Sequence, residues 1–188
     1  MSPSTARALR ARRARDGRIL LVTAVLVLSG CAALRNAIAP APEGRPSGRE
    51  GWLLYTVGAL EVQVPSDWKV RGDPDRVTLT APDDAARLEV ARAGERFGDE
   101  KACLVAAEEA LKRGEASFQR VRRHPTKLAD RPAIVQEADQ DGWHGWGYAV
   151  CDGGVQYRLF FAGRSPMPKA ILDIHRDVVA RTRIGGEA

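Results

Sequence analysis

Histidine and cysteine are scarce in this chain, which has three of each among its 188 residues. His124, His144 and His175 do not stand at a metal-ligand spacing from another histidine, a cysteine or a cluster of carboxylates. The sequence also has no Gly-x-Ser-x-Gly motif, no glycine-rich phosphate loop and no Cys-x-x-Cys pair. Because such patterns mark nucleophilic, nucleotide-dependent and redox-active sites, we expect no catalytic residue, no metal, no cofactor and no enzyme.

A long hydrophobic run is missing as well. The uncharged run from Ile19 to Leu28 spans ten residues, whereas a helix that crosses a bilayer needs about 20. Six arginines precede this run within residues 1–18, and Ser29, Gly30 and Cys31 follow it. A basic stretch, a short apolar stretch and small residues are typical of a secretory signal, so we expect no permanent transmembrane helix.

Leu28-Ser29-Gly30-Cys31 resembles the lipobox of bacterial lipoproteins, in which an apolar residue and two small ones precede an invariant cysteine. The resemblance implies that the Cys31 thiol receives lipid, that the signal is cut just before it, and that the new amino group is acylated. The alternative is an ordinary signal peptide with a chance cysteine near its cleavage site. In many Gram-negative lipoproteins, a residue other than aspartate after the lipidated cysteine implies transport to the outer membrane. Residue 32 is alanine rather than aspartate, so we expect the protein to be anchored in the outer membrane and to face the periplasm, rather than to lie in the inner membrane or at the cell surface.

An excess of positive charge is absent from the part that would remain after cleavage. Six of the 29 Lys and Arg and one of the 24 Asp and Glu precede Gly30, so 23 of each sign follow it. Nucleic-acid binding needs a concentrated basic surface, so we expect no nucleic-acid partner. One local basic cluster remains, which a solvated strand edge explains about as well as a binding surface does: Arg120, Arg122, Arg123 and His124.

Composition divides the chain into three parts. Residues 1–30 are the expected signal peptide. Residues 31–50 hold the cysteine to be lipidated and a segment rich in proline and glycine, which is typical of a flexible tether. Residues 51–185 are expected to form a single globular domain, because about 135 residues can bury a core of their own.

Alternating and β-branched segments predict the strands of this domain. Leu60, Val62 and Val64, for example, alternate with two polar residues, which is typical of a sheet with one buried face. The tight turn Asp152-Gly153-Gly154 predicts a hairpin. The expected strands are Trp52–Val57, Leu60–Val64, Val77–Ala81, Leu88–Ala91, Phe118–Arg123, Ala133–Ala138, Trp143–Cys151 and Val155–Ala162.

Two segments have the three- and four-residue spacing of helices. The first runs from Asp99, which can cap its start, to Arg113, and Gly114 suits the left-handed position just past its end. The second covers about Pro168 to Arg181 and aligns Ile171, Ile174, Val178 and Val179 on one stripe.

This order of strands, helix, strands and helix predicts an α+β fold, in which an antiparallel sheet of about seven to eight strands in two groups is flanked by two helices. Together with the turn Val64-Pro65-Ser66-Asp67-Trp68, the order resembles the PsbP-like fold over residues 52–184. That superfamily includes photosystem accessory proteins and many bacterial lipoproteins. The resemblance implies a sandwich with accessory or assembly work rather than catalysis, and it supplies no site residues.

Two cysteines, Cys103 and Cys151, remain once Cys31 carries lipid. In an oxidising compartment they favour a disulfide between the inner face of the first helix and the end of a central strand. Such a bond would close a loop of about 50 residues and contribute about 3–4 kcal/mol in the chain-entropy model. The alternative is two separate buried thiols.

The most unusual local composition lies around His144, between Gly142-Trp143 and Gly145-Trp146. It makes Trp143, His144, Trp146 and Tyr148 a candidate patch for a ligand or a partner. The alternative is a core strand whose glycines make room for large rings across the sheet.

The sequence therefore predicts an envelope lipoprotein, anchored to the membrane through Cys31, with a non-catalytic protein-binding or assembly role. Its partner would be another envelope protein. The alternative is a carrier or sensor of a small apolar ligand in the periplasm, bound between sheet and helix near Trp143, Trp146 and Tyr148.

Overall fold

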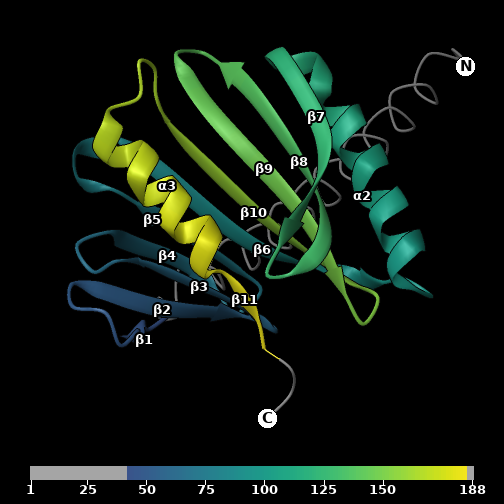
Figure 1. Cartoon of the computed structure of the whole chain (residues 1–188), viewed down its shortest axis with the longest axis horizontal. Helices are drawn as coiled ribbons and strands as arrows, with labels where there is room; N and C mark the ends of the chain where they lie inside the picture. Colours follow the sequence, from purple (N-terminus) through teal and green to yellow (C-terminus); the bar gives the residue numbers. More distant parts are fainter. Residues whose placement is uncertain (1–41, 186–188) are drawn as a thin grey trace, which may run out of the picture. The chain divides into compact units, whose positions relative to one another are not determined.

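The computed structural model describes residues 42–185, which form two antiparallel sheets and two α-helices (Figure 1). The expected signal peptide and Cys31 lie outside the described residues. The helices are α2 (Glu100–Gly114) and α3 (Lys169–Arg181), and η1 (Pro82–Asp84) and η2 (Glu115–Ser117) are short 3-10 turns. The strands are β1 (Arg45–Pro46), β2 (Trp52–Val57), β3 (Leu60–Pro65), β4 (Lys69–Asp73), β5 (Arg76–Thr80), β6 (Ala86–Arg96), β7 (Gln119–Leu128), β8 (Arg131–Gln140), β9 (Trp143–Asp152), β10 (Val155–Arg164) and β11 (Arg183–Ile184).

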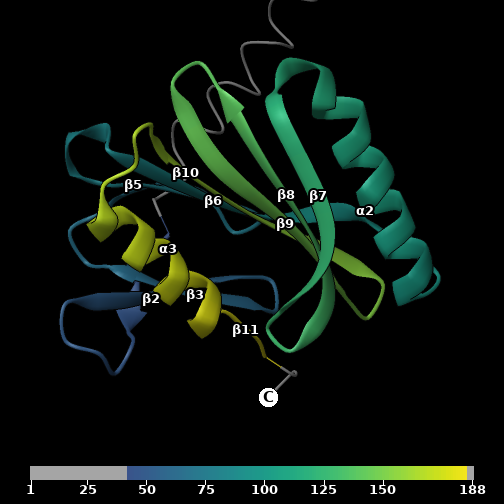
Figure 2. The same ribbon diagram turned by 45° about the horizontal axis from the view of Figure 1, so that its top comes forward.

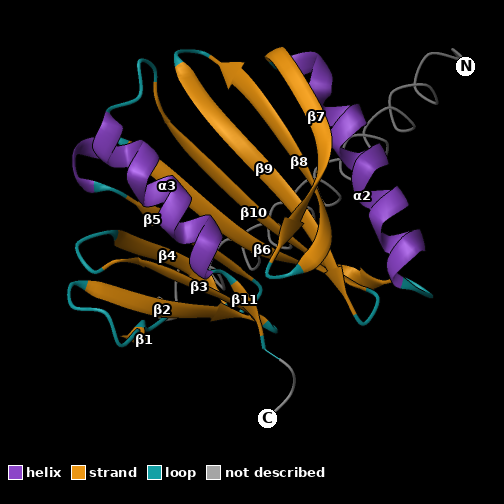
Figure 3. Cartoon of the chain, in the orientation of Figure 1, coloured by secondary structure: helices purple, strands orange, loops and turns teal. Residues whose placement is uncertain are grey.

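The strands pair in the order β1-β2-β3-β11 in a four-stranded sheet and β4-β5-β6-β10-β9-β8-β7 in a seven-stranded sheet, and each neighbouring pair is antiparallel (Figure 3). The predicted α+β fold with two groups of strands is confirmed. The described residues hold eleven strands rather than seven or eight. The three strands that the sequence does not predict are β1, β4 and β11. Their sequences show no alternation of apolar and polar residues, because β1 and β11 have two residues each and β4 has a single apolar residue, Val70.

The folded part begins before residue 51, where the sequence predicts a tether. Strand β1 pairs with β2 through Arg45↔Leu54 and Pro46↔Leu53. The guanidinium of Arg49 lies 4.0 Å from the centre of the Trp52 ring, and its Nη1 donates to the Asp177 carboxylate at 2.8 Å. The chain is therefore already packed against sheet and helix from Arg45 onward.

The core lies between the two sheets and α3. Leu60, Val62 and Val64 of β3 are fully buried, as the alternation predicts. They belong to one cluster with the buried apolar residues of β5, β6 and β10, and α3 joins it through Ile171 and Val178. Complete burial of such side chains contributes about 1.5–3 kcal/mol each.

The two helices cover opposite faces of the seven-stranded sheet. Trp146 of β9 stacks on His175 of α3, whereas Cys151 of β9 is bonded to Cys103 of α2. Successive residues of a strand point to opposite faces, so an even and an odd position of β9 face different sides. Figures 1 and 2 show α2 beside β7 and α3 next to β3. Neither helix of the described residues is long and apolar enough to cross a membrane.

Helix α2 begins as the sequence predicts but ends differently. The Asp99 carboxylate accepts a hydrogen bond from the Ala102 amide at 2.7 Å and so caps the first turn. Gly114 does not take the left-handed conformation, because its φ is −79°. The chain continues into η2 instead, and the Ser117 hydroxyl donates to the Gly114 carbonyl at 2.9 Å. That bond satisfies a helix-end carbonyl without a glycine turn, so the predicted left-handed cap at Gly114 is wrong, although the helix ends within one residue of the predicted position.

The predicted basic cluster lies on β7, the edge strand of the seven-stranded sheet. Arg120 pairs with Asp139 at 2.7 Å, and Arg123 pairs with Glu115 at 2.7 Å. Pro125 also lies in this strand and lacks an amide hydrogen. Charges and a proline are common protections of a sheet edge, because they discourage pairing with another chain.

The predicted hairpin between β9 and β10 is confirmed. Asp152 and Val155 are paired, so the loop holds two residues, Gly153 and Gly154. Their φ angles are +54° and +75°. Positive φ at both positions matches the right-handed twist of the flanking strands, and glycine adopts it without strain.

Candidate functional site

Strand β9 places the four residues of the predicted patch on two different faces. His144, Trp146 and Tyr148 face α3, since Trp146 and Tyr148 both contact His175 and His144 meets Trp146 edge-on, with ring centres 4.5 Å apart. Trp143 faces α2 and lines a groove beside that helix. The patch is therefore two separate groups of side chains.

The group that faces α3 is centred on His175, whose exposed fraction is 8%. Its ring stacks on Trp146 with centres 4.1 Å apart, and its Nε2 lies 3.2 Å from the Tyr148 hydroxyl. Burial, together with the nearby His144 and Arg176, lowers the pKa of His175 to about 4. Burial, with a smaller effect of Glu137, raises the pKa of Tyr148 to about 12. Near neutral pH both groups are therefore uncharged, and a hydrogen bond joins the Tyr148 hydroxyl and His175 Nε2.

His144 lies at the rim of this group between two carboxylates. Its Nδ1 is 2.8 Å from Asp139 and its Nε2 is 3.2 Å from Glu137. The hydrogen bond from His144, with help from Arg120, lowers the pKa of Asp139. Over the described part of the chain, no three histidine, cysteine or acidic residues are placed to hold a metal ion. The group joins α3 to the sheet by stacking and hydrogen bonds.

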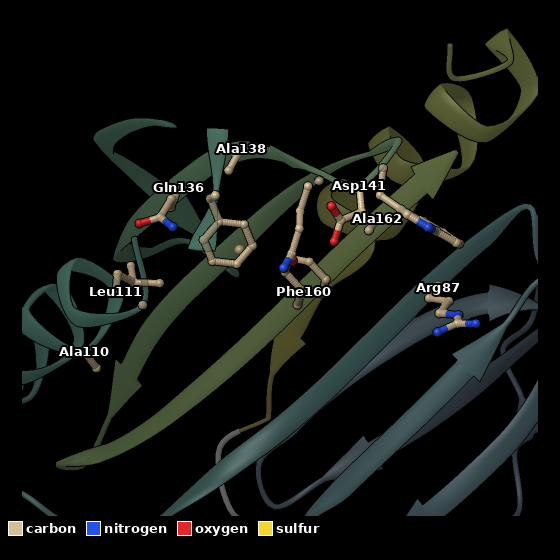
Figure 4. Close-up of a pocket in the computed structure, with 14 residues that line it drawn as sticks. Arg87, Ala110, Leu111, Gln136, Ala138, Asp141, Phe160 and Ala162 are labelled. Carbon is tan, nitrogen blue, oxygen red and sulfur yellow. The ribbon is translucent and has the colours of Figure 1, made fainter. Parts of the chain in front are cut away.

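The other face of the sheet carries an open groove with a volume of about 480 Å³ (Figure 4). Ala110 and Leu111 of α2 form one side, Arg87 of β6 lies at the opposite side, and Phe160 lies between them. Most of the surface is apolar, and 41% of Phe160 is exposed. The remaining lining residues are Gly114, Phe118, Gln136, Ala138, Gln140, Asp141, Trp143, Gly145, Gly147 and Ala162.

Two glycines of β9 shape the floor of this groove. Gly147 is paired across the strands with Phe160, and a Cβ atom at Gly147 would lie 3.6 Å from the Phe160 ring. A Cβ atom at Gly145 would lie 2.9 Å from the Phe161 carbonyl oxygen and 3.3 Å from the Phe160 ring. Gly145 therefore leaves room for the Phe160 ring and the backbone of β10, as the alternative interpretation of the sequence predicts, whereas a methyl group at Gly147 would make an ordinary contact.

Replacing Gly145 by alanine is expected to lower the free energy of unfolding by about 1–3 kcal/mol, because the new methyl group collides with backbone. Gly147→Ala is the matched control on the same strand and face. Its methyl group makes an ordinary contact with Phe160, so its stability is expected to stay within about 0.5 kcal/mol of the wild type. Urea unfolding of both variants measures the difference, and equal losses would contradict this account of the floor.

Trp143 lies at the charged end of the groove. The guanidinium groups of Arg87 and Arg164 each lie 5.3 Å from the centre of its ring, a distance at which cation and ring attract. Arg164 also donates to the Asp84 carbonyl at 3.3 Å. Neither guanidinium pairs with a carboxylate among the residues that the structure describes. Asp141, in the turn between β8 and β9, is the one acidic residue of the lining.

The disulfide expected from the sequence is present and links the start of α2 to β9. Cys103 and Cys151 are bonded, with Cα atoms 6.2 Å apart, and they stand 48 positions apart in sequence. Cys103 and Ala107 are the buried residues of α2. The helix is therefore held near its start and leaves the groove open toward its end.

These features define an antiparallel α+β sandwich of the PsbP-like kind. No protein-family model matches the sequence, and no curated protein matches it either. Among solved structures, the chain is similar to cyanobacterial PsbP (CyanoP) from Synechocystis sp. PCC 6803, with 9% identity and a TM-score of 0.53 over 78% of this chain and 100% of that one. At this identity the likeness shows the fold alone.

Two further solved structures match less closely. One is a protein from Bacteroides thetaiotaomicron VPI-5482, with 11% identity and a TM-score of 0.49 over 73% of this chain; the match spans about half, 49%, of that longer chain. The other is LpqN of Mycobacterium tuberculosis, described as involved in cell envelope biogenesis, with 14% identity and a TM-score of 0.45 over 68% of this chain and 83% of that one.

Proposed function

We propose that this chain is a lipid-anchored envelope protein with a non-catalytic accessory role, and that the groove beside α2 is its binding surface. The observation that supports the binding role is an open apolar groove with a half-exposed phenylalanine on its floor. A groove of this volume lies in the range of small-molecule sites, which are mostly apolar with a few placed polar groups. The anchor rests on the Leu28-Ser29-Gly30-Cys31 pattern.

The face of the sheet that packs against α3 is less suited to this role. There the rings of Trp146, Tyr148 and His175 fill the space between sheet and helix. The binding surface therefore lies on the side of Trp143 rather than on the side of the other three patch residues.

One experiment tests anchor and groove together. A photoreactive benzoylphenylalanine replaces Phe160 in the full chain, which is irradiated in membranes of a bacterial host and purified for intact-mass measurement. We expect a chain that begins at Cys31 with acyl mass added, and a discrete further adduct at residue 160. The same photoreactive residue at His124, an exposed position of the edge strand β7, is the control.

A chain cut elsewhere, with Cys31 free or absent, would refute the anchor. An adduct at residue 160 no more abundant than that at residue 124 would refute the groove as the binding surface.

A further inference from the structure

The floor of the groove beside α2 has no free strand edge with which a peptide could form backbone hydrogen bonds. It is made by β8, β9, β10 and β6, and each of these strands already has a partner on both sides. Recognition of an extended peptide by a sheet depends on the free edge of a strand, and an extended peptide laid across paired strands would find no backbone partners in the floor. An unbranched apolar chain needs no such partners.

The groove also has one apolar end and one cationic end. The strand spacing of roughly 4.8 Å puts β8 and β6 about 14 Å apart across the floor. Ala110 and Leu111 of α2 lie at one end, and Arg87 lies at the other (Figure 4). Arg164 is not among the residues that line the groove, but its guanidinium lies as close to the Trp143 ring as that of Arg87, so a second positive charge lies beside that end.

The charges at the cationic end match a singly charged anion. Arg87 and Arg164 have no carboxylate partner within residues 42–185, while Asp141 lines the same end. Among these three side chains, the positive charges exceed the negative by one. A guanidinium forms charge-assisted hydrogen bonds with a carboxylate, which are about twice as strong as neutral ones.

We propose that the groove beside α2 binds a long-chain fatty carboxylate, with its alkyl chain along Phe160 toward α2 and its head group at Arg87, on the side of the groove where Arg164 adds a second positive charge. This inference rests on the proposed function, because it names the ligand class of the same groove. Gly147 provides the space that the chain occupies, since nothing but the Phe160 ring and the Gln136 carbonyl lies within 4 Å of a Cβ atom there.

The full-length acylated chain is tested in nanodiscs of phosphatidylcholine, a lipid without net charge. Two probes are used: a palmitic acid that carries a photoreactive diazirine in its chain, and the matching alcohol with a hydroxyl in place of the carboxylate. After irradiation, peptide mass spectrometry locates and quantifies the label. We expect the acid to label Leu111 and Phe160 peptides about tenfold more than the alcohol does, because a charged hydrogen bond contributes that much discrimination.

Three variants distinguish the contribution of the head group to labelling from that of the alkyl chain. Arg87→Gln is expected to lower labelling by the acid about tenfold and to leave labelling by the alcohol unchanged. Asp141→Asn removes the opposing charge and is expected to raise labelling by the acid; asparagine tolerates the positive φ of +48° at this position. Gly147→Leu fills the floor and is expected to abolish labelling by both probes.

Equal labelling by acid and alcohol, or an unchanged response in Arg87→Gln, would overturn the carboxylate assignment. Labelling of the groove by neither probe would overturn the ligand class. In that case a discrete protein adduct at residue 160 in the host membranes would leave the proposed function standing, whereas its absence as well would refute both.

Discussion

Replacing Cys103 and Cys151 together by serine is expected to release α2 from the sheet and to lower the free energy of unfolding by about 3–4 kcal/mol. The bond closes a loop of 48 positions, so its loss returns a large conformational entropy to the unfolded chain. The bond also fixes one of the two side chains of the helix that are buried, Cys103 and Ala107. Leu111 and Val105 remain half-exposed or exposed.

Hydrogen exchange followed by mass spectrometry distinguishes this local release from a general loss of stability. In the double serine variant, the α2 amides are expected to exchange well before those of β9 and β10, while in the oxidised wild type the three elements differ much less. Reduction of the wild type with a thiol is the matched control, since it breaks the same bond without a substitution. Unchanged protection of α2 in both samples would show that packing alone holds the helix.

Acidification is expected to weaken the fold through His175. Its pKa is about 4 in the folded chain, against an ordinary value of 6.5. Between these values the unfolded chain binds a proton that the folded chain does not, so the free energy of unfolding falls as the pH falls. The stabilisation is complete above pH 6.5 and is lost by about pH 4, and the loss amounts to about 3 kcal/mol.

Urea unfolding across this pH range measures the slope. His175→Phe keeps a ring against Trp146 and removes the titrating group, so its slope between pH 6.5 and pH 4 is expected to be much shallower. His124→Gln changes an exposed histidine of β7 and is expected to retain the wild-type slope. The explanation fails if His124→Gln flattens the curve as much as His175→Phe does.

The elements with a strong local signal could be predicted from the sequence. The alternation of Leu60, Val62 and Val64, the cap at Asp99 and the pair Gly153-Gly154 each act within a few residues, and the structure has the strand, the helix start and the hairpin there. Strands β1 and β11 gave no such signal. Two residues cannot show a period, and both strands exist because β2 and β3 offer them partners.

The candidate site depended on contacts that no local pattern shows. Residues 143 to 148 were a recognisable cluster in sequence, but alternation along a strand divides them between two faces. That division was available from the sequence once the segment was taken as a strand. Arg87 and Phe160 were not recognisable, because β6 and β10 bring together residues more than seventy positions apart, through the pair Phe160↔Glu89 and its neighbours.

The core cluster and the groove share few side chains. Phe160, Trp143, Arg87 and Leu111 are absent from the set of residues that packs between the two sheets and α3. Substitutions at these positions therefore remove little of the buried contact on which folding depends. Over evolutionary time such a protein can exchange the residues of its groove while the scaffold beneath stays the same.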